Sequence, residues 1–379
     1  MRFVKSNFLL SFISNAVIFY PAPSNLNYFW NFGFYAGLCL VIQILTGIFL
    51  SMYYVSDQSM AMWSVEHIMR DVNFGWLVRY AHANGASMFF VAVYCHILRG
   101  MYYGSYFHPR SPLWSVGVLI FFFMIVTAFI GYVLPWGQMS FWAATVITSL
   151  VSVIPFVGFD ILIWLWGGYS VDNATLNRFF SLHYLFPFII LALVFVHLVL
   201  LHQDGSNNSM GISYTPERVS FSPFYIFKDF FGIIVFLFVF SIFIFFFPNV
   251  LGHSDNYIMA NPMVTPSHIV PEWYFLPFYA ILRSIPDKLF GVLTMVLSIV
   301  ILVLLPYLID QQIRSATFVY FFRLSFYYFV VVAVFLTWLG SQPAEFPYVG
   351  LSQFFTFLYF FYFFCLLPFL SFVQSGISK

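Results

Sequence analysis

The chain has very little charge and few cysteines. Only 7% of its 379 residues are charged, whereas soluble domains carry about 25%. Its net charge of +1 offers no basic surface to a nucleic acid. The three cysteines, Cys39, Cys95 and Cys365, lie far apart in apolar segments and form no C-x-x-C pair. These shortages argue against a soluble domain, a nucleic-acid-binding protein, an iron–sulfur or zinc site, and a haem attached through C-x-x-C-H.

Long apolar runs make up most of the sequence, since 62% of the residues are hydrophobic. Runs of about 20 apolar residues are typical of membrane-spanning helices, so we predict an all-α integral membrane protein with eight transmembrane helices. The start of the chain, 1–19, is predicted to be an amphipathic helix on the membrane surface. A polar turn at 203–224 predicts two regions, 1–205 and 206–379, of four spans each. The eight predicted spans are 30–53, 75–103, 113–133, 178–202, 225–247, 288–308, 318–340 and 348–370.

The connections between spans give the chain a direction. An even number of spans places both termini on one side, and that side receives nine of the 14 basic residues but only four of the 13 acidic ones. Positive charge stays inside, so both termini face the matrix or cytoplasm. The two long connections, 134–177 and 248–287, then face outward.

Four histidines lie in the second and fourth spans at one repeated spacing. His82 and His96 are 14 residues apart, as are His183 and His197. Fourteen helical residues turn through about 1400°, close to four full turns, and rise roughly 21 Å, so each pair shares one helix face. Because these two spans run parallel, His82 is level with His183 near the outer face, and His96 with His197 near the inner face. Neutral imidazole is a good iron ligand, so the first four spans are predicted to form a bundle that holds two stacked, non-covalent b-type haems. Buried structural histidines or a proton relay are the alternatives, and the doubled spacing favours haem.

Glycines repeat the same spacing in the first and third spans. Gly33 and Gly47 are 14 residues apart, as are Gly117 and Gly131. A missing side chain lets the backbone approach a flat ring, which favours a cofactor contact over ordinary small-residue helix packing.

Two arginines lie close to the histidines. Arg79 lies three residues before His82, and Arg99 lies three residues after His96. Each arginine is closer than its histidine to the nearer membrane face. Arginine pairs well with carboxylates such as haem propionates. The alternative is a flanking charge that extends to the membrane surface.

Long motifs across nearly the whole chain resemble cytochrome b of the mitochondrial type. The chain is not split and its two histidine spacings are equal, which favours the respiratory type over the chloroplast type. The resembling segments are RYAHANGAS (79–87), GYVLPWGQMSFW (131–142), GGYSVDNATLNRFF (167–180), PEWYFLPFYAILRSIPDKL (271–289) and LTWLGSQPAEFPYVG (336–350).

The resemblance implies the haem-bearing subunit of ubiquinol–cytochrome c reductase, complex III. In that family quinol is oxidised at the outer face; one electron passes to a Rieske iron–sulfur protein and on to a c-type cytochrome subunit. The other electron crosses the membrane through two haems, from the lower-potential site of His82 and His183 to the higher-potential site of His96 and His197. It then reduces quinone at the inner face. This Q cycle contributes to the proton gradient. The family further implies other complex III subunits, lipid and a homodimer as partners. It also implies the mitochondrial inner membrane, with both termini on the matrix side.

The resemblance places an outer quinol pocket around Glu272. A carboxylate near the membrane surface can accept a proton from quinol and turn outward to release it. Tyr132, Phe129, Pro271 and Tyr279 are expected to line the pocket. From position alone, Glu272 could also be a solvated loop carboxylate, and the aromatic residues ordinary membrane packing.

Ala143 is a departure from the family, which usually has glycine there. The added methyl group narrows the wall of the outer pocket, so we expect quinol turnover to survive and rigid methoxyacrylate-type inhibitors to bind weakly. Ala143→Gly should raise the sensitivity of quinol–cytochrome c reductase activity to these inhibitors. Equal sensitivity of the two proteins would contradict this expectation.

The inner quinone pocket is expected at the matrix ends of the fourth, fifth and first spans. The resemblance makes His202, Lys228 and Asp229 its contacts and proton donors, with Asn31 nearby. Interfacial anchoring is the alternative for His202 and Lys228. Phe34 stands where the family often has serine, which removes one expected quinone contact.

Two other functions are compatible with parts of this pattern. A haem-bearing anchor would pass electrons between a peripheral dehydrogenase and quinone at one site only, and a transporter would use the histidines in a proton path. Two quinone pockets on opposite faces distinguish a quinol–cytochrome c reductase from the anchor. An optical spectrum with two reducible b-type haems distinguishes it from the transporter.

Overall fold

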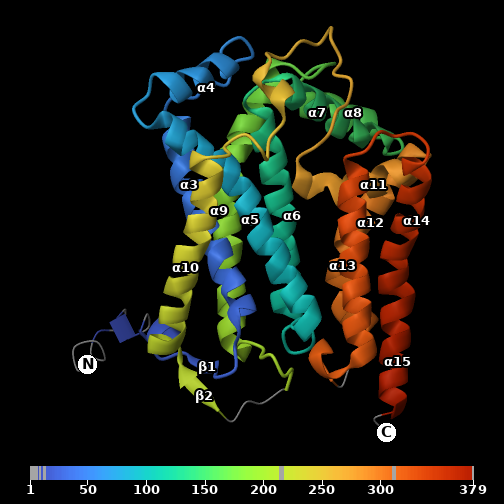
Figure 1. Ribbon diagram of the computed structural model, residues 1–379. Helices are drawn as coiled ribbons and strands as arrows, with labels where there is room; N and C mark the ends of the chain where they lie inside the picture. The colour runs from blue at the N-terminus through green and yellow to red at the C-terminus, as the bar shows by residue number, and fades with distance from the viewer. Residues whose placement is uncertain (1–6, 8–9, 12–13, 213–216, 310–312, 378–379) are drawn as a thin grey trace.

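The computed structural model describes residues 7, 10–11, 14–212, 217–309 and 313–377. Helices dominate this part of the chain and most of them run side by side (Figure 1), which confirms the predicted all-α membrane fold. The elements in chain order are η1 (Ser14–Ile18), β1 (Pro21–Pro23), η2 (Tyr28–Asn31), α3 (Phe32–Ser51), α4 (Ala61–Arg70), α5 (Gly75–Tyr103), α6 (Ser111–Val133), α7 (Gln138–Ser149), η3 (Leu150–Val153), α8 (Gly158–Trp166), α9 (Asn173–Asp204), β2 (Arg218–Ser220), α10 (Phe221–Phe245), η4 (Ser254–Tyr257), η5 (Trp273–Phe275), α11 (Leu276–Ser284), α12 (Lys288–Leu308), η6 (Ala316–Phe318), α13 (Tyr320–Gly340), α14 (Tyr348–Phe361), η7 (Tyr362–Leu366) and α15 (Leu367–Ile377).

Seven helical segments of the described chain are long and apolar enough to cross a membrane. They correspond to every predicted span except 75–103. That span is α5, a helix of 29 residues and about 43 Å at 1.5 Å per residue. Arginines, histidines and an asparagine make α5 less apolar than the others. Seven of the eight predicted spans are therefore confirmed by length and composition. The eighth, α5, is long enough to cross a membrane but is less apolar than the other seven.

The long helices form two groups (Figure 1). In the first group α3 packs against α5, and α6 packs against α9. In the second group α11 lies against α12, α13 and α14. Helix α10 packs against α3 and α5, where Phe236 and Phe240 join the buried cluster around Tyr35 and Phe90. The division at residue 205 stays a prediction, but α10, which follows it in sequence, lies on the first bundle.

The two long outer connections contain helices of their own. Segment 134–177 forms an α7–α8 hairpin, and segment 248–287 contains η4, η5 and α11. The sequence predicts long loops at both places, and this prediction missed the short helices. Helices of nine to 12 residues are too short to span a membrane, so a search for runs of about 20 apolar residues misses them.

The start of the chain pairs with the middle. Strand β1 is antiparallel to β2, with Pro21 opposite Ser220, at the end of the molecule where the chain termini lie (Figure 1). Most of the surface helix predicted over 1–19 lies outside the described residues; of its last part, Ser14–Ile18 forms one π-helical turn.

Candidate functional site: two histidine pairs and an outer cavity

The four intramembrane histidines meet in two pairs. His82 of α5 faces His183 of α9 with ring centroids 6.2 Å apart. His96 and His197, on the same two helices, face each other at 6.4 Å. These are the pairs that the parallel course of the two helices predicts.

Each of the four spaced glycines makes room for one of these rings. A Cβ atom on Gly131 would lie 2.3 Å from Cε1 of His183, and one on Gly33 would lie 2.9 Å from Cε1 of His96. A Cβ atom on Gly47 would lie 3.1 Å from Cε1 of His82, and one on Gly117 would lie 3.1 Å from Cε1 of His197. The contact of these glycines with a flat cofactor stays a prediction. In this structure an imidazole ring lies against each glycine, so the glycines let α3 and α6 support the histidines of α5 and α9.

The spacing of the imidazole pairs fits an iron between them. Two metal–imidazole bonds of about 2 Å each, with roughly 1 Å from each nitrogen to its ring centre, would separate the ring centroids by about 6 Å. Both observed separations, 6.2 and 6.4 Å, agree with this value. Two facing imidazoles in an apolar bundle are a donor set that fits the iron of a b-type haem.

The outer pair is oriented through its second ring nitrogens. Nδ1 of His183 lies 2.9 Å from the carbonyl oxygen of Thr127, so Nδ1 carries the proton and the lone pair of Nε2 is left to bind a metal. Nδ1 of His82 lies 2.9 Å from the hydroxyl oxygen of Thr46. Such partners fix the tautomer and the orientation of a metal-binding histidine.

Arg99 gives the inner pair a different arrangement. Its guanidinium lies 3.1 Å from Nδ1 of His96 and 5.3 Å from the ring centre of Trp30. Arginine only donates hydrogen bonds, so this contact places the His96 proton on Nε2. If His96 were to bind an iron through Nε2, its proton would have to lie on Nδ1, and Arg99 would then need another acceptor. A propionate is a suitable acceptor for it.

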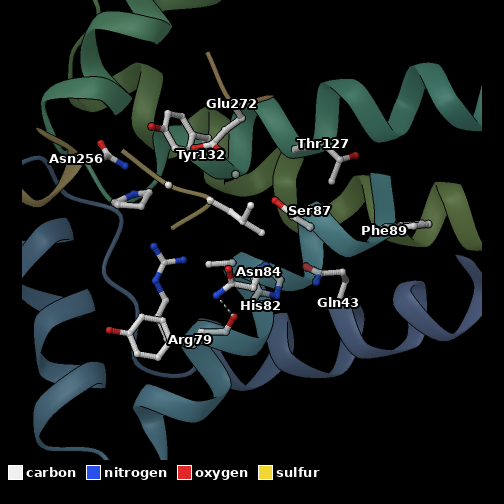
Figure 2. Close-up of a pocket in the computed structure, with 18 of the residues that line it drawn as sticks. Gln43, Arg79, His82, Asn84, Ser87, Phe89, Thr127, Tyr132, Asn256 and Glu272 are labelled. Carbon is white, nitrogen blue, oxygen red and sulfur yellow. Dashed lines mark hydrogen bonds between the residues drawn. The ribbon is translucent and has the colours of Figure 1, made fainter. Parts of the chain in front are cut away.

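An outer cavity of about 230 Å³ adjoins the pair of His82 and His183. A second cavity, of about 110 Å³, shares these two histidines, Arg79 and Gly131 with it. Both cavities thus adjoin the pair of His82 and His183. The larger cavity also contains Glu272 (Figure 2).

Glu272 shares this cavity with Tyr132, and the two lie next to each other (Figure 2). Burial raises the pKa of the Glu272 carboxyl to about 7, an effect that the Tyr132 hydroxyl partly offsets. A carboxyl with this pKa exists in both protonation states near neutral pH. It can therefore take up a proton and give it back.

Four residues predicted for the outer pocket do not line this cavity. Phe129 packs edge-on against Phe179, with ring centroids 6.0 Å apart. Ala143 is buried in α7 with 4% of its surface exposed. Pro271 directly precedes Glu272, and the Tyr279 hydroxyl donates to the carbonyl of Ile269 at 3.3 Å.

The residues predicted for the inner pocket meet at the opposite end of the bundle. Asn31 donates to the carboxylate of Asp229 at 2.7 Å. Lys228 donates to the carbonyl of Leu26 at 2.5 Å.

His202 reaches this end of the bundle from α9. Its ring lies 4.7 Å from the ring of Tyr20. The carbonyl of Tyr20 accepts a hydrogen bond from the backbone of Phe221 at the start of α10. Tyr20 thus joins His202 to the start of α10. Phe34, where serine is common, has 45% of its surface exposed.

Sequence reasoning missed the polar residues that surround the outer pair. Thr46 and Thr127 bond the histidine rings, and Gln43 lines both cavities. Asn256 accepts hydrogen bonds from the backbone and hydroxyl of Ser140 and so ties the second outer connection to α7. Thr46 and Gln43 lie one and four residues before Gly47, so the glycine spacing was the only signal that pointed to them.

Comparisons with known proteins place the chain in a family. Residues 17–205 match the family model described as Cytochrome b/b6/petB, and residues 259–360 match Cytochrome b(C-terminal)/b6/petD. Cytochrome b of Chondrus crispus is 59% identical over 99% of this chain and 98% of its own. Cytochrome b of Oryza sativa subsp. japonica is 57% identical over 98% of this chain and 93% of its own.

A solved structure agrees with these relatives over the full length. A chain of a hyperthermophilic respiratory complex III superimposes with a TM-score of 0.92 and 36% sequence identity, covering 99% of both chains. Near-complete coverage by relatives of more than 50% identity, with one shared fold, leaves no other family in question. The chain belongs to the cytochrome b family.

Proposed function

We propose that this chain is the membrane subunit of a respiratory quinol–cytochrome c reductase that oxidises quinol at its outer face and reduces quinone at its inner face. The observation that carries the proposal is the outer cavity, which brings Glu272 and Tyr132 to the pair of His82 and His183. A proton acceptor and a haem-type donor set in one cavity can take up one proton and one electron of a quinol.

At the outer face, Glu272 is the proton acceptor. Oxidation of a quinol to a quinone releases two protons and two electrons. One electron and one proton would leave toward the Rieske iron–sulfur protein, and the other electron would pass to the haem that His82 and His183 would hold. Glu272 in its carboxylate form takes the other proton from the quinol hydroxyl, and Tyr132 beside it holds the carboxyl in place. Burial favours the protonated form that results. Proton transfer to a positioned side chain contributes about 10²–10⁴-fold to a reaction rate.

Between the faces, His82, His183, His96 and His197 would hold two b-type haems. A haem held by two imidazoles transfers single electrons and does not bind oxygen. The residues' own part is positioning: the glycines let the rings lie against α3 and α6, and Thr46 and Thr127 orient the outer pair. Arg79 lines both outer cavities and is placed to pair with a propionate.

At the inner face, Asp229, Lys228 and His202 supply charge and protons to a quinone. The hydrogen bond from Asn31 holds the Asp229 carboxylate in a fixed position. The Lys228 ammonium lies 4.7 Å from the ring centre of Tyr28. This contact keeps the lysine's positive charge at this end of the bundle.

The proposal includes the setting of the chain. We assign it to a complex with a Rieske iron–sulfur protein and a c-type cytochrome subunit, present as a dimer in the mitochondrial inner membrane with both termini on the matrix side. The support is the family's complex and the excess of positive charge on the side of the termini.

Activity of the purified complex tests the proposal at both faces. Asp229→Asn should leave the first reduction by quinol intact in a stopped-flow experiment and slow reoxidation at the inner face, which lowers steady-state turnover. Equal loss in both phases would contradict a separate inner site, and would favour an anchor with a single quinone site.

The rate of quinol oxidation should depend on pH through Glu272. The carboxylate is the form that accepts a proton, so the rate should rise as pH passes upward through about 7, the pKa of the buried carboxyl. Glu272→Gln should lower the maximal rate by about 10²-fold, the lower end of the usual general-base contribution, and abolish this titration. Steady-state rates between pH 5.5 and 9 measure both effects.

Two outcomes would contradict the role of Glu272. One is an unchanged pH profile in Glu272→Gln. The other is a comparable loss in Glu345→Gln, a control substitution of an exposed outer carboxylate.

A further inference from the structure

One arginine on the outer side is held without a carboxylate partner. Arg283, near the end of α11, is half-buried, and the ion pairs of the described residues are His67–Asp71 and Glu66–Arg70. A guanidinium removed from water needs compensating contacts. Its contacts therefore indicate what it does.

Two of these contacts are with the end of α13. The guanidinium NH2 group donates to the carbonyl of Leu339 at 3.1 Å and to that of Gln342 at 2.8 Å. Leu339 lies in the last turn of α13, where the helix carries a partial negative charge, and Gln342 lies two residues beyond the end of the helix. A cation at this place is stabilised, and it joins α11 to the end of α13 and to the segment that follows.

The third contact is with Tyr279. The Arg283 guanidinium carbon lies 4.6 Å from the centre of the Tyr279 ring, within the range of a cation–π interaction. Tyr279 in turn donates through its hydroxyl to the carbonyl of Ile269. Ile269 is three residues before Glu272, so a line of contacts runs from the end of α13 to the segment that carries the proton acceptor.

We infer that Arg283 is a positioning residue for the outer quinol site: it holds the Tyr279 ring, and through the Tyr279 hydroxyl it fixes the segment 269–272. The inference rests on the proposed oxidation of quinol at this site. Arg283 itself touches neither the cavity nor its histidines. Its effect on the reaction passes through Tyr279.

The experiment compares Arg283→Gln, Arg283→Lys and Tyr279→Phe in the assembled complex. Arg283→Gln should raise KM for quinol about tenfold, the usual size for loss of a hydrogen bond to a charged group, with a smaller fall in kcat and unchanged haem content. Arg283→Lys keeps a cation near the ring but cannot reproduce the geometry of the two carbonyl contacts, so it should restore part of the KM. Tyr279→Phe should also raise KM, since it removes the hydroxyl that holds Ile269.

The double variant Arg283→Gln/Tyr279→Phe gives the decisive comparison. If both residues act along one line of contacts, its KM should be close to that of the more affected single variant. Two independent effects would multiply, and that result would overturn the inference.

Arg323→Gln is the matched control. Arg323 lies 5.7 Å from the ring centre of Tyr320, at the beginning of α13 and thus at the opposite end of the helix from Leu339. Its loss should leave KM unchanged. An equal KM effect in this control, or a loss of haem in Arg283→Gln, would reduce Arg283 to a general stabilising residue. Inactive wild-type complex with quinol would instead refute the proposed function itself.

Discussion

Replacing His82 with leucine should remove the outer haem and leave the inner one in place. His82 and His183 face each other at 6.2 Å, and leucine offers no iron ligand. The pair of His96 and His197 is roughly 21 Å away along α5 and α9, from the helical rise, and keeps its own contacts. We expect about half of the reducible b-haem absorbance to disappear and quinol–cytochrome c reductase activity to fall to background.

Two further leucine variants make this result specific. His96→Leu should remove the other half of the absorbance. His67→Leu is the control, because His67 lies exposed on α4 and is paired with Asp71; it should retain both haems and full activity. Loss of both haems in His82→Leu, with a folded and assembled chain, would mean that the two sites are not independent.

Gly131→Ala should have nearly the same effect as loss of a ligand. A Cβ atom at this position would lie 2.3 Å from Cε1 and 2.9 Å from Nδ1 of His183. The ring cannot easily move aside, because its Nδ1 is held by the carbonyl of Thr127. Overpacking of this kind costs about 1–3 kcal/mol, and here it would displace the His183 ring from the position in which it faces His82. Optical spectra should show loss of the outer haem with the inner haem retained.

The other glycines provide a graded comparison. Alanine at Gly47 would place its Cβ 3.1 Å from His82, a contact that a small shift relieves, so the outer haem should be retained with an altered spectrum. Gly37 is the control, since a Cβ there would meet nothing within 4 Å. Equal haem loss in Gly131→Ala and Gly37→Ala would show that the close approach to His183 is not the cause.

Much of the fold could be predicted from the sequence because a membrane imposes a simple rule. The polar backbone must be satisfied within the helix, so α12 begins and ends where its apolar segment does. The pairing of the histidines followed from the same rule, since two helices separated by one span run parallel. The short helices α7 and α8 carry no such constraint and were not predicted.

The surroundings of the histidines could be predicted only in part. The 14-residue glycine spacing indicated that something flat lies against α3 and α6. It could not show that this is an imidazole, because helix rotation decides which side chain meets which glycine. The roles of Thr46 and Thr127 depend on single hydrogen bonds between helices. The line from Arg283 to Ile269 joins residues distant in sequence, which no pattern within one segment reveals.

A redox titration of the purified wild-type complex, followed by its optical spectrum, tests the central claim most directly. Two pairs of facing imidazoles should give two b-type haem components of equal amplitude, each titrating with one electron and with low-spin spectra from bis-histidine ligation. A single component, or a high-spin component that binds carbon monoxide, would contradict the account of two histidine pairs linking an outer and an inner quinone site.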